Sequence, residues 1–147
     1  MTDPAVKDEV RWNGGAMVVF ILASVALLCM LEYRDALARI GTLSILDLIV
    51  LGLATFRAVH LLTFDKIFDF VRESFMDKVN GEYVKPTRGF RHMLSELLEC
   101  LWCTGMWSAV IILTLYLLSP AGKFIVWTLA IAGIGSMLQI ASKRVAD

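Results

Sequence analysis

Two cysteines three residues apart, Cys100 and Cys103, are the residues with the clearest chemical potential. As thiolates they would supply half of a tetrahedral zinc site, which His60 and His92 could complete within the chain and a second copy could complete in a dimer. As a redox or acylated pair they would need a lowered thiol pKa, and Arg57 could supply the cation that lowers it. As packing residues they would share a helix face, because positions i and i+3 lie on one side. The spacing alone leaves zinc binding, thiol chemistry and packing open.

Two charged side chains interrupt stretches that are otherwise apolar, where insertion into a membrane costs about 2.5 to 3.5 kcal/mol per charge. Arg57 lies near one end of its stretch. If this stretch packs antiparallel to the apolar stretch that follows Glu99, Arg57 and Glu99 are expected to form an ion pair. Asp47 lies near the opposite end and is expected to be solvated. His60 and His92 have ordinary structural roles if they bind no metal.

The chain carries none of the common catalytic signatures. A glycine-rich phosphate loop, a His-Glu-x-x-His motif, a nucleophile elbow and a cluster of paired carboxylates are all absent from the sequence. We therefore expect a non-enzymatic protein with no cofactor, zinc being the one exception that the cysteines suggest. The 14 basic residues equal the 14 acidic ones, which disfavours a basic surface for nucleic acid.

Four apolar stretches must position these residues, over 14–31, 43–62, 100–119 and 124–142. A bilayer core of about 30 Å needs roughly 20 helical residues, so each stretch is long enough or nearly long enough to cross. With 58% hydrophobic residues and a mean hydropathy of +0.70, the chain is too apolar for a water-soluble domain of its size. These features predict an all-α fold, a single membrane domain over 1–147 with four transmembrane helices. A turn at 120–122 would leave the last two helices antiparallel.

The segment 63–99 is the one long polar connection, and its first half predicts an amphipathic helix over 64–79. The apolar face of this helix recurs at spacings of three and four residues: Phe64, Ile67, Phe68, Val71 and Phe75. Directly after a membrane span, such a helix is expected to lie flat in the membrane interface. Alternatively, it covers the end of the helical bundle or a partner subunit. Asn80 and Gly81 predict a turn, and a second helix is expected to continue into the span at 100–119.

The distribution of basic residues predicts the orientation. With a cytoplasmic N-terminus, ten lysines and arginines lie on the cytoplasmic side and three outside. We expect a multi-pass protein of the cytoplasmic (inner) membrane with both termini in the cytoplasm. The cysteines then face a reducing compartment, which disfavours a structural disulfide. Loss of the first span would move only the N-terminus outside.

The sequence resembles a family of small bacterial and phage membrane proteins, domain of unknown function 1360, over roughly 46–139. The resemblance rests on ATFRAVHLLTFDKIFDFVR, from Ala54, and ECLWCTGMWSAV, from Glu99. The motif residues are Arg57, Asp65, Arg72, Cys100, Trp102, Cys103, Gly105 and Trp107. The family implies a membrane location and a shared local structure around these residues, with no established activity.

These observations predict a non-enzymatic integral membrane protein in contact with the bilayer and with a second copy or another membrane protein. Small residues four positions apart on the helices would permit close helix packing in such an oligomer. A cluster of Arg57, Asp65, Cys100 and Cys103 on the cytoplasmic face would organise the bundle or bind a partner or metal. Two alternatives stay open: a holin-like pore former or envelope-acting phage protein, and a thiol-active membrane protein.

Overall fold

The computed structural model describes residues 4–79 and 81–146. Four helices within this part of the chain are long and apolar enough to cross a membrane, which confirms the predicted all-α membrane fold. They are α1 (Pro4–Tyr33), α2 (Ile45–Thr63), α5 (Leu101–Leu118) and α6 (Pro120–Ala146). The shorter elements are η1 (Leu37–Thr42), η2 (Lys66–Phe68), α3 (Asp69–Ser74), β1 (Asp77–Val79), β2 (Glu82–Val84) and α4 (Phe90–Glu99).

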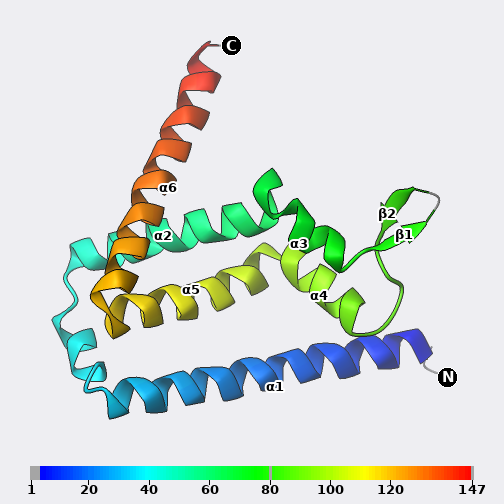
Figure 1. The fold of residues 1–147 in the computed structure, drawn as a ribbon, viewed down its shortest axis with the longest axis horizontal. Coiled ribbons are helices and arrows are strands. Elements are labelled where there is room, and N and C mark those ends of the chain that lie inside the picture. The colour runs from blue at the N-terminus through cyan, green and yellow to red at the C-terminus, as the bar shows by residue number, and fades with distance from the viewer. Residues whose placement is uncertain (1–3, 80, 147) are drawn as a thin grey trace.

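Helices α1, α2 and α5 extend in nearly the same direction, with α1 and α5 parallel and α2 running the opposite way (Figure 1). The small core forms where α2, α5 and α6 meet and includes Ala54, Leu117, Val126 and Ala130, each at most 2% exposed. Most large apolar side chains on the four long helices point outward. Their exposure fits a solvent of lipid, which removes the hydrophobic penalty that water would impose.

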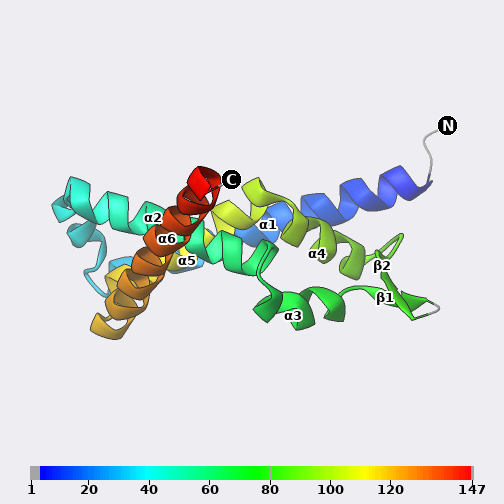
Figure 2. The same ribbon diagram turned by 90° about the horizontal axis from the view of Figure 1, so that it is seen from above.

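Helix α6 does not return along α5, as the predicted antiparallel pair required, but crosses α2 at a steep angle (Figures 1 and 2). The cause is a sharp corner at Ser119, whose backbone is extended, with Pro120 already the first residue of α6. A Cβ at Gly122 would overlap the carbonyl oxygen of Leu115, so this corner requires glycine. Along α6, a Cβ at Gly133 would lie 2.9 Å from the carbonyl oxygen of Leu53, so the missing side chain lets α6 and α2 approach closely.

The predicted continuous amphipathic helix over 64–79 is wrong. Asp65 is extended (φ −78°, ψ 136°), and the chain then forms η2, the six-residue α3 and the antiparallel hairpin of β1 and β2. Phe64 and Ile67 remain 57% and 68% exposed, and Phe70 joins them at 66%. The other predicted interface residues, Phe68, Val71 and Phe75, are half-buried.

The hairpin turns where the sequence predicts it, with Gly81 in the left-handed region at φ +91°. Asn80, the other residue predicted for this turn, lies outside the described residues. The predicted continuation of the preceding helix into the third span is wrong, because α4 and α5 are separated at Cys100. This residue has an extended backbone (φ −81°, ψ 101°) and serves as the N-cap of α5.

Candidate functional site

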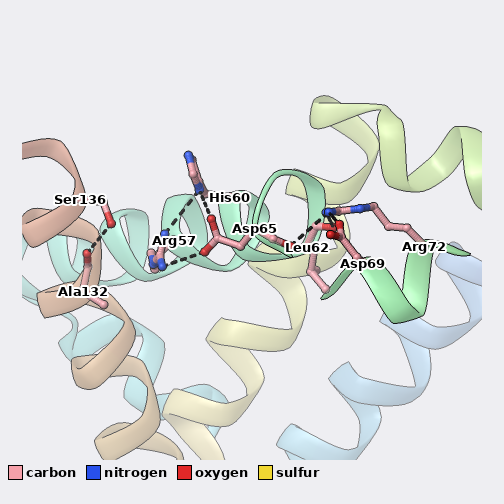
Figure 3. A network of polar contacts seen from close by, with 8 residues as sticks. All are labelled: Arg57, His60, Leu62, Asp65, Asp69, Arg72, Ala132 and Ser136. Carbon is pink, nitrogen blue, oxygen red and sulfur yellow. Dashed lines mark hydrogen bonds and ion pairs between the residues drawn. The ribbon is translucent and has the colours of Figure 1, made fainter. Parts of the chain in front are cut away.

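The first polar group lies at the end of α2, where Arg57, His60 and Asp65 meet (Figure 3). Arg57 Nη2 lies 2.8 Å from Asp65 Oδ2, and the two side chains are only 19% and 26% exposed. His60 Nδ1 lies 3.2 Å from Asp65 Oδ1 and 3.4 Å from Arg57 Nη1, so it either donates to the carboxylate or accepts from the guanidinium. Asp65 reaches this position because the extended backbone after α2 turns its side chain back toward Arg57.

Arg72 ties the following helix to the same place. Its guanidinium donates to the carbonyl oxygens of Leu62 (2.9 Å) and Asp65 (3.1 Å) and also pairs with Asp69 (Figure 3). The last carbonyls of an α-helix have no intrahelical partner, so Arg72 satisfies one of the groups that the end of α2 leaves free. The residues Arg57, Asp65 and Arg72 therefore form one connected set, which we call the arginine network.

Glu99 is not the partner of Arg57, and this prediction from antiparallel pairing is wrong. Glu99 Oε2 instead accepts a hydrogen bond from Lys85 Nζ at 2.8 Å, and Glu96 Oε1 lies 3.6 Å from the same ammonium. The hydrogen bond to Glu99 stabilises the charged ammonium and raises the pKa of Lys85. Asp65 pairs with Arg57 because it follows α2 directly, whereas Glu99 precedes the break at Cys100 and pairs with Lys85.

The two cysteines meet at the N-terminus of α5. Cys100 Sγ accepts a hydrogen bond from the backbone N–H of Cys103 at 3.3 Å, and the two Sγ atoms lie 2.6 Å apart as free thiols. The thiol of Cys103 and its backbone N–H, both directed at Cys100 Sγ, lower the pKa of Cys100 below its ordinary value of 9.0. The packing interpretation placed both cysteines on one helix face, yet Cys100 is a cap outside the helix.

The aromatic residues of the cysteine motif do not form one packed group. Trp102 is 88% exposed, as an interfacial anchor at a span end would be. Trp107 instead packs edge to face on Phe20 of α1, with ring centroids 4.8 Å apart. Gly105 has open space around it and makes no close helix contact.

The predicted zinc set within one chain does not form. His60 faces Asp65, and His92 Nε2 lies 3.5 Å from Glu96 Oε1, so neither histidine joins Cys100 and Cys103. Across the part of the chain that the structure describes, no three His, Cys, Asp or Glu side chains gather closely enough to hold a metal ion. A zinc site completed by a second copy stays a prediction.

A cavity of about 900 Å³ lies beside the cysteines, between α1, α4 and α5. One part of its wall is polar and contains Lys85, Glu96 and Glu99. The remainder is mostly apolar and consists of side chains from the parallel helices α1 and α5 together with the two cysteines. These residues are Met17, Phe20, Ile21, Cys100, Cys103, Met106 and Trp107. Sequence reasoning missed this cavity because it exists only through the packing of α1 on α5.

A second polar group, also missed, lies at the far end of the helices. Asp47 accepts a hydrogen bond from Tyr116 Oη at 2.6 Å and forms a capping box with Ser44, so the prediction of a merely solvated Asp47 is wrong. Lys123 Nζ lies 5.1 Å from the Tyr116 ring centroid, and Arg39 donates to a carbonyl of α5. The spacing Ser44-x-x-Asp47 is a helix-start signal that could have located the cap.

Comparison with known proteins identifies a family for this sequence. The profile of the family described as Protein of unknown function (DUF1360) matches residues 50–142. The chain belongs to this family. The resemblance drawn from the cysteine and arginine motifs is thereby confirmed, and the matched range contains both the arginine network and the cysteine pair.

Two relatives of this DUF1360 protein come from Bacillus subtilis (strain 168). UPF0713 protein YngL is 40% identical over 108 residues, which cover 67% of this chain and 80% of YngL. Sporulation protein YjcA is 33% identical over 104 residues, which cover 64% of this chain and 88% of YjcA. No solved structure matches the chain. Helix α1, which forms one wall of the cavity, lies outside the range that the family profile matches.

Proposed function

We propose that this DUF1360 protein is a non-enzymatic, multi-pass protein of the cytoplasmic membrane that holds a docking surface against the cytoplasmic side of the bilayer. The observation that carries the proposal is the arginine network. Because Arg57 and Arg72 both bind Asp65, the chain leaves α2 in one direction and cannot swing freely. Phe64, Ile67 and Phe70 are left pointing outward from this rigid exit.

Lipid is the medium that suits these three exposed side chains, which we call the apolar platform. They follow a membrane span directly, so they lie at the depth where aromatic and aliphatic side chains bury into the headgroup boundary. The platform then holds the hairpin of β1 and β2 close to the membrane surface. Arg91 of α4 secures the hairpin by donating to Asp77 Oδ1 and to the carbonyl oxygen of Met76, each at 2.6 Å. The hairpin is the surface that a protein partner would contact.

Site-directed spin labelling tests the platform. Ile67→Cys and Lys78→Cys are labelled in a chain whose native cysteines are replaced by serine, and the protein is placed in lipid nanodiscs. We expect the label at Ile67 to be accessible to oxygen and protected from a water-soluble nickel chelate, and the label at Lys78, on the hairpin, to show the reverse. A chelate-accessible label at Ile67 contradicts the membrane placement.

Orientation has its own test. Reporter domains fused after Asn80 and after Asp147 are expected to be active only in their cytoplasmic forms, in agreement with the distribution of basic residues. A periplasmic signal at either fusion overturns the orientation and with it the cytoplasmic docking surface. The platform could still lie in an interface, so the spin-label result is independent.

A second copy of the chain is the partner that we propose within the membrane. The C-terminal half of α6 extends beyond the other helices (Figure 1) and exposes Ile134 (46%) and Leu138 (65%). Ala132 and Ser136 on this helix are small enough for close approach of a neighbouring helix. Disulfide cross-linking of Leu138→Cys in membranes should give a dimer, whereas Val18→Cys on α1 should not. Equal cross-linking of both variants contradicts a specific contact through α6.

A second candidate function, a thiol-active membrane protein, is supported by one specific observation. The Sγ atoms of Cys100 and Cys103 lie 2.6 Å apart at the N-terminus of α5, so a small adjustment would join them. Treatment of the reduced protein with diamide should form an intramolecular disulfide and remove both cysteines from reaction with N-ethylmaleimide. Retention of both reactive thiols contradicts this candidate.

A further inference from the structure

The cysteine pair and the cavity beside it have no role in the docking function proposed above. Both side chains border the cavity of about 900 Å³, near the upper end of the range for pockets that hold small molecules. The pair is therefore within reach of any molecule that occupies the cavity.

The wall of the cavity changes character along its length. Glu99, which precedes Cys100 in the chain, and its hydrogen-bond partner Lys85 form part of the polar wall of the cavity. Further along the parallel helices α1 and α5, Phe20 packs on Trp107, and Met106 continues the apolar wall. A ligand that fits must combine a compact polar head with an apolar remainder.

The chemistry of Cys100 and Cys103 limits which ligand of this kind would use them. Two thiols held 2.6 Å apart can give up two electrons together by forming one disulfide bond. A fatty acyl chain would fill the apolar part of the cavity but has no group that accepts those electrons. A lipid-soluble quinone has a polar ring with two carbonyl oxygens, an apolar tail and a two-electron reduction.

We infer that the cavity binds a membrane quinone and that this quinone oxidises Cys100 and Cys103, so that the pair acts as a redox switch. The inference rests on the thiol-active candidate above. In the reaction, the S–H bonds of both cysteines break and a bond forms between the two Sγ atoms. The two electrons and two protons pass to the quinone oxygens and give a quinol. A reduced thiol or dithiol of the cytoplasm would restore the pair by disulfide exchange.

The position of the pair explains why the oxidant comes from the membrane. Cys103 lies in the first turn of a helix that spans the bilayer, and the cavity wall opposite it is α1, also a spanning helix. A molecule dissolved in lipid reaches such a cavity between two helices without crossing water. The redox state of the membrane quinone pool would then set the state of the cysteines.

The experiment uses the reduced full-length protein in nanodiscs, without oxygen. One sample receives a fully substituted benzoquinone with a ten-carbon tail. This quinone can oxidise thiols, but its ring has no free position to which a thiol could add. A parallel sample receives diamide. Disulfide formation is followed by mass spectrometry after alkylation. We expect both oxidants to form the disulfide between Cys100 and Cys103 in the unmodified protein, and the absorbance of the quinone to fall by one equivalent per chain.

A substitution that fills the cavity should slow oxidation by the quinone but not oxidation by diamide. Ala16 lines the cavity and is small, so Ala16→Phe should slow oxidation by the quinone at least about tenfold, equivalent to about 1.4 kcal/mol of lost binding. Its reaction with diamide should be unchanged, which also shows that the variant is folded around its thiols. Val18→Phe, a substitution of similar size at an outward-facing position of α1, serves as the matched control and should react like the unmodified protein. Met106→Trp fills the same space from α5 and provides a second variant.

Each result has a separate meaning. Disulfide formation with diamide but not with the quinone overturns the inference and leaves the thiol-active candidate standing. Failure with both oxidants overturns both. Equal quinone rates in Ala16→Phe, Met106→Trp and Val18→Phe place the reaction outside the cavity and overturn the inference, as does a quinone adduct on either cysteine.

Discussion

The substitution Asp65→Asn tests the arginine network most directly. It removes the negative charge that lies 2.8 Å from Arg57, preserves the size of the side chain and leaves one acceptor oxygen. Arg57 then remains near the end of a membrane span with no full charge to balance it. We expect the helical bundle to lose stability and the chain after α2 to lose its single exit direction.

The geometry sets the magnitude. Two unit charges about 4 Å apart interact by about 4 kcal/mol at an effective dielectric constant of about 20 and by about 1 kcal/mol in water. The side chains of Arg57 and Asp65 are 19% and 26% exposed, so the pair lies between these limits. Some of the loss is recovered because Arg57 can extend toward water and His60 stays beside it. We expect a loss of about 2 kcal/mol in the free energy of unfolding, between the values for exposed and buried pairs.

Reversible unfolding in mixed micelles with increasing SDS measures this loss. A double-mutant cycle with Arg57→Gln isolates the pair, and we expect a coupling energy of about 2 kcal/mol. Glu99→Gln is the matched control, because Glu99 is 54% exposed and pairs with Lys85, so its loss should cost less than about 1 kcal/mol. A coupling energy near zero, or a larger loss in Glu99→Gln than in Asp65→Asn, refutes the reasoning.

Three further substitutions test other contacts. The hydrogen bonds from Cys103 lower the pKa of Cys100, so Cys103→Ala should slow alkylation of Cys100 at neutral pH and shift the pH profile of the reaction upward; an unshifted profile contradicts the contact. Gly122→Ala places a Cβ against a carbonyl of α5 and should cost at least about 2 kcal/mol in the same SDS titration, whereas Gly105→Ala, which has open space, should cost nothing or stabilise its helix. Tyr116→Phe removes the donor to the capping carboxylate and should cost about 1.5 kcal/mol; an unchanged midpoint would show that this hydrogen bond is not formed in lipid.

Local sequence patterns predict an element correctly where the pattern lies within that one element. The four spans follow from windows of apolar residues, each of which depends on its own composition and length. The motif around Cys100 and Cys103 led to the correct family. The turn at Gly81 follows from the freedom of glycine at positive φ.

Predictions failed where one element depended on another. The spacing of Phe64, Ile67 and Phe75 predicts one helix, but the backbone of Asp65 is extended and its carboxylate pairs with Arg57 of the preceding helix, a contact that the local spacing does not contain. Antiparallel pairing of the two spans predicts that Glu99 pairs with Arg57, but the chain breaks at Cys100 and Glu99 pairs with Lys85 instead.

By itself the sequence determined that this protein is a chain of four helices long and apolar enough to cross a membrane, because hydropathy and length are local properties. Only the tertiary structure decided which residues touch. Asp65 rather than Glu99 neutralises Arg57, His60 does not join Cys100 in a zinc set, and α1 forms one wall of the cavity beside the cysteines. These outcomes depend on the break at Cys100, on the extended backbone at Asp65 and on the packing of α1, which are set by contacts between elements and not by any one local stretch of sequence.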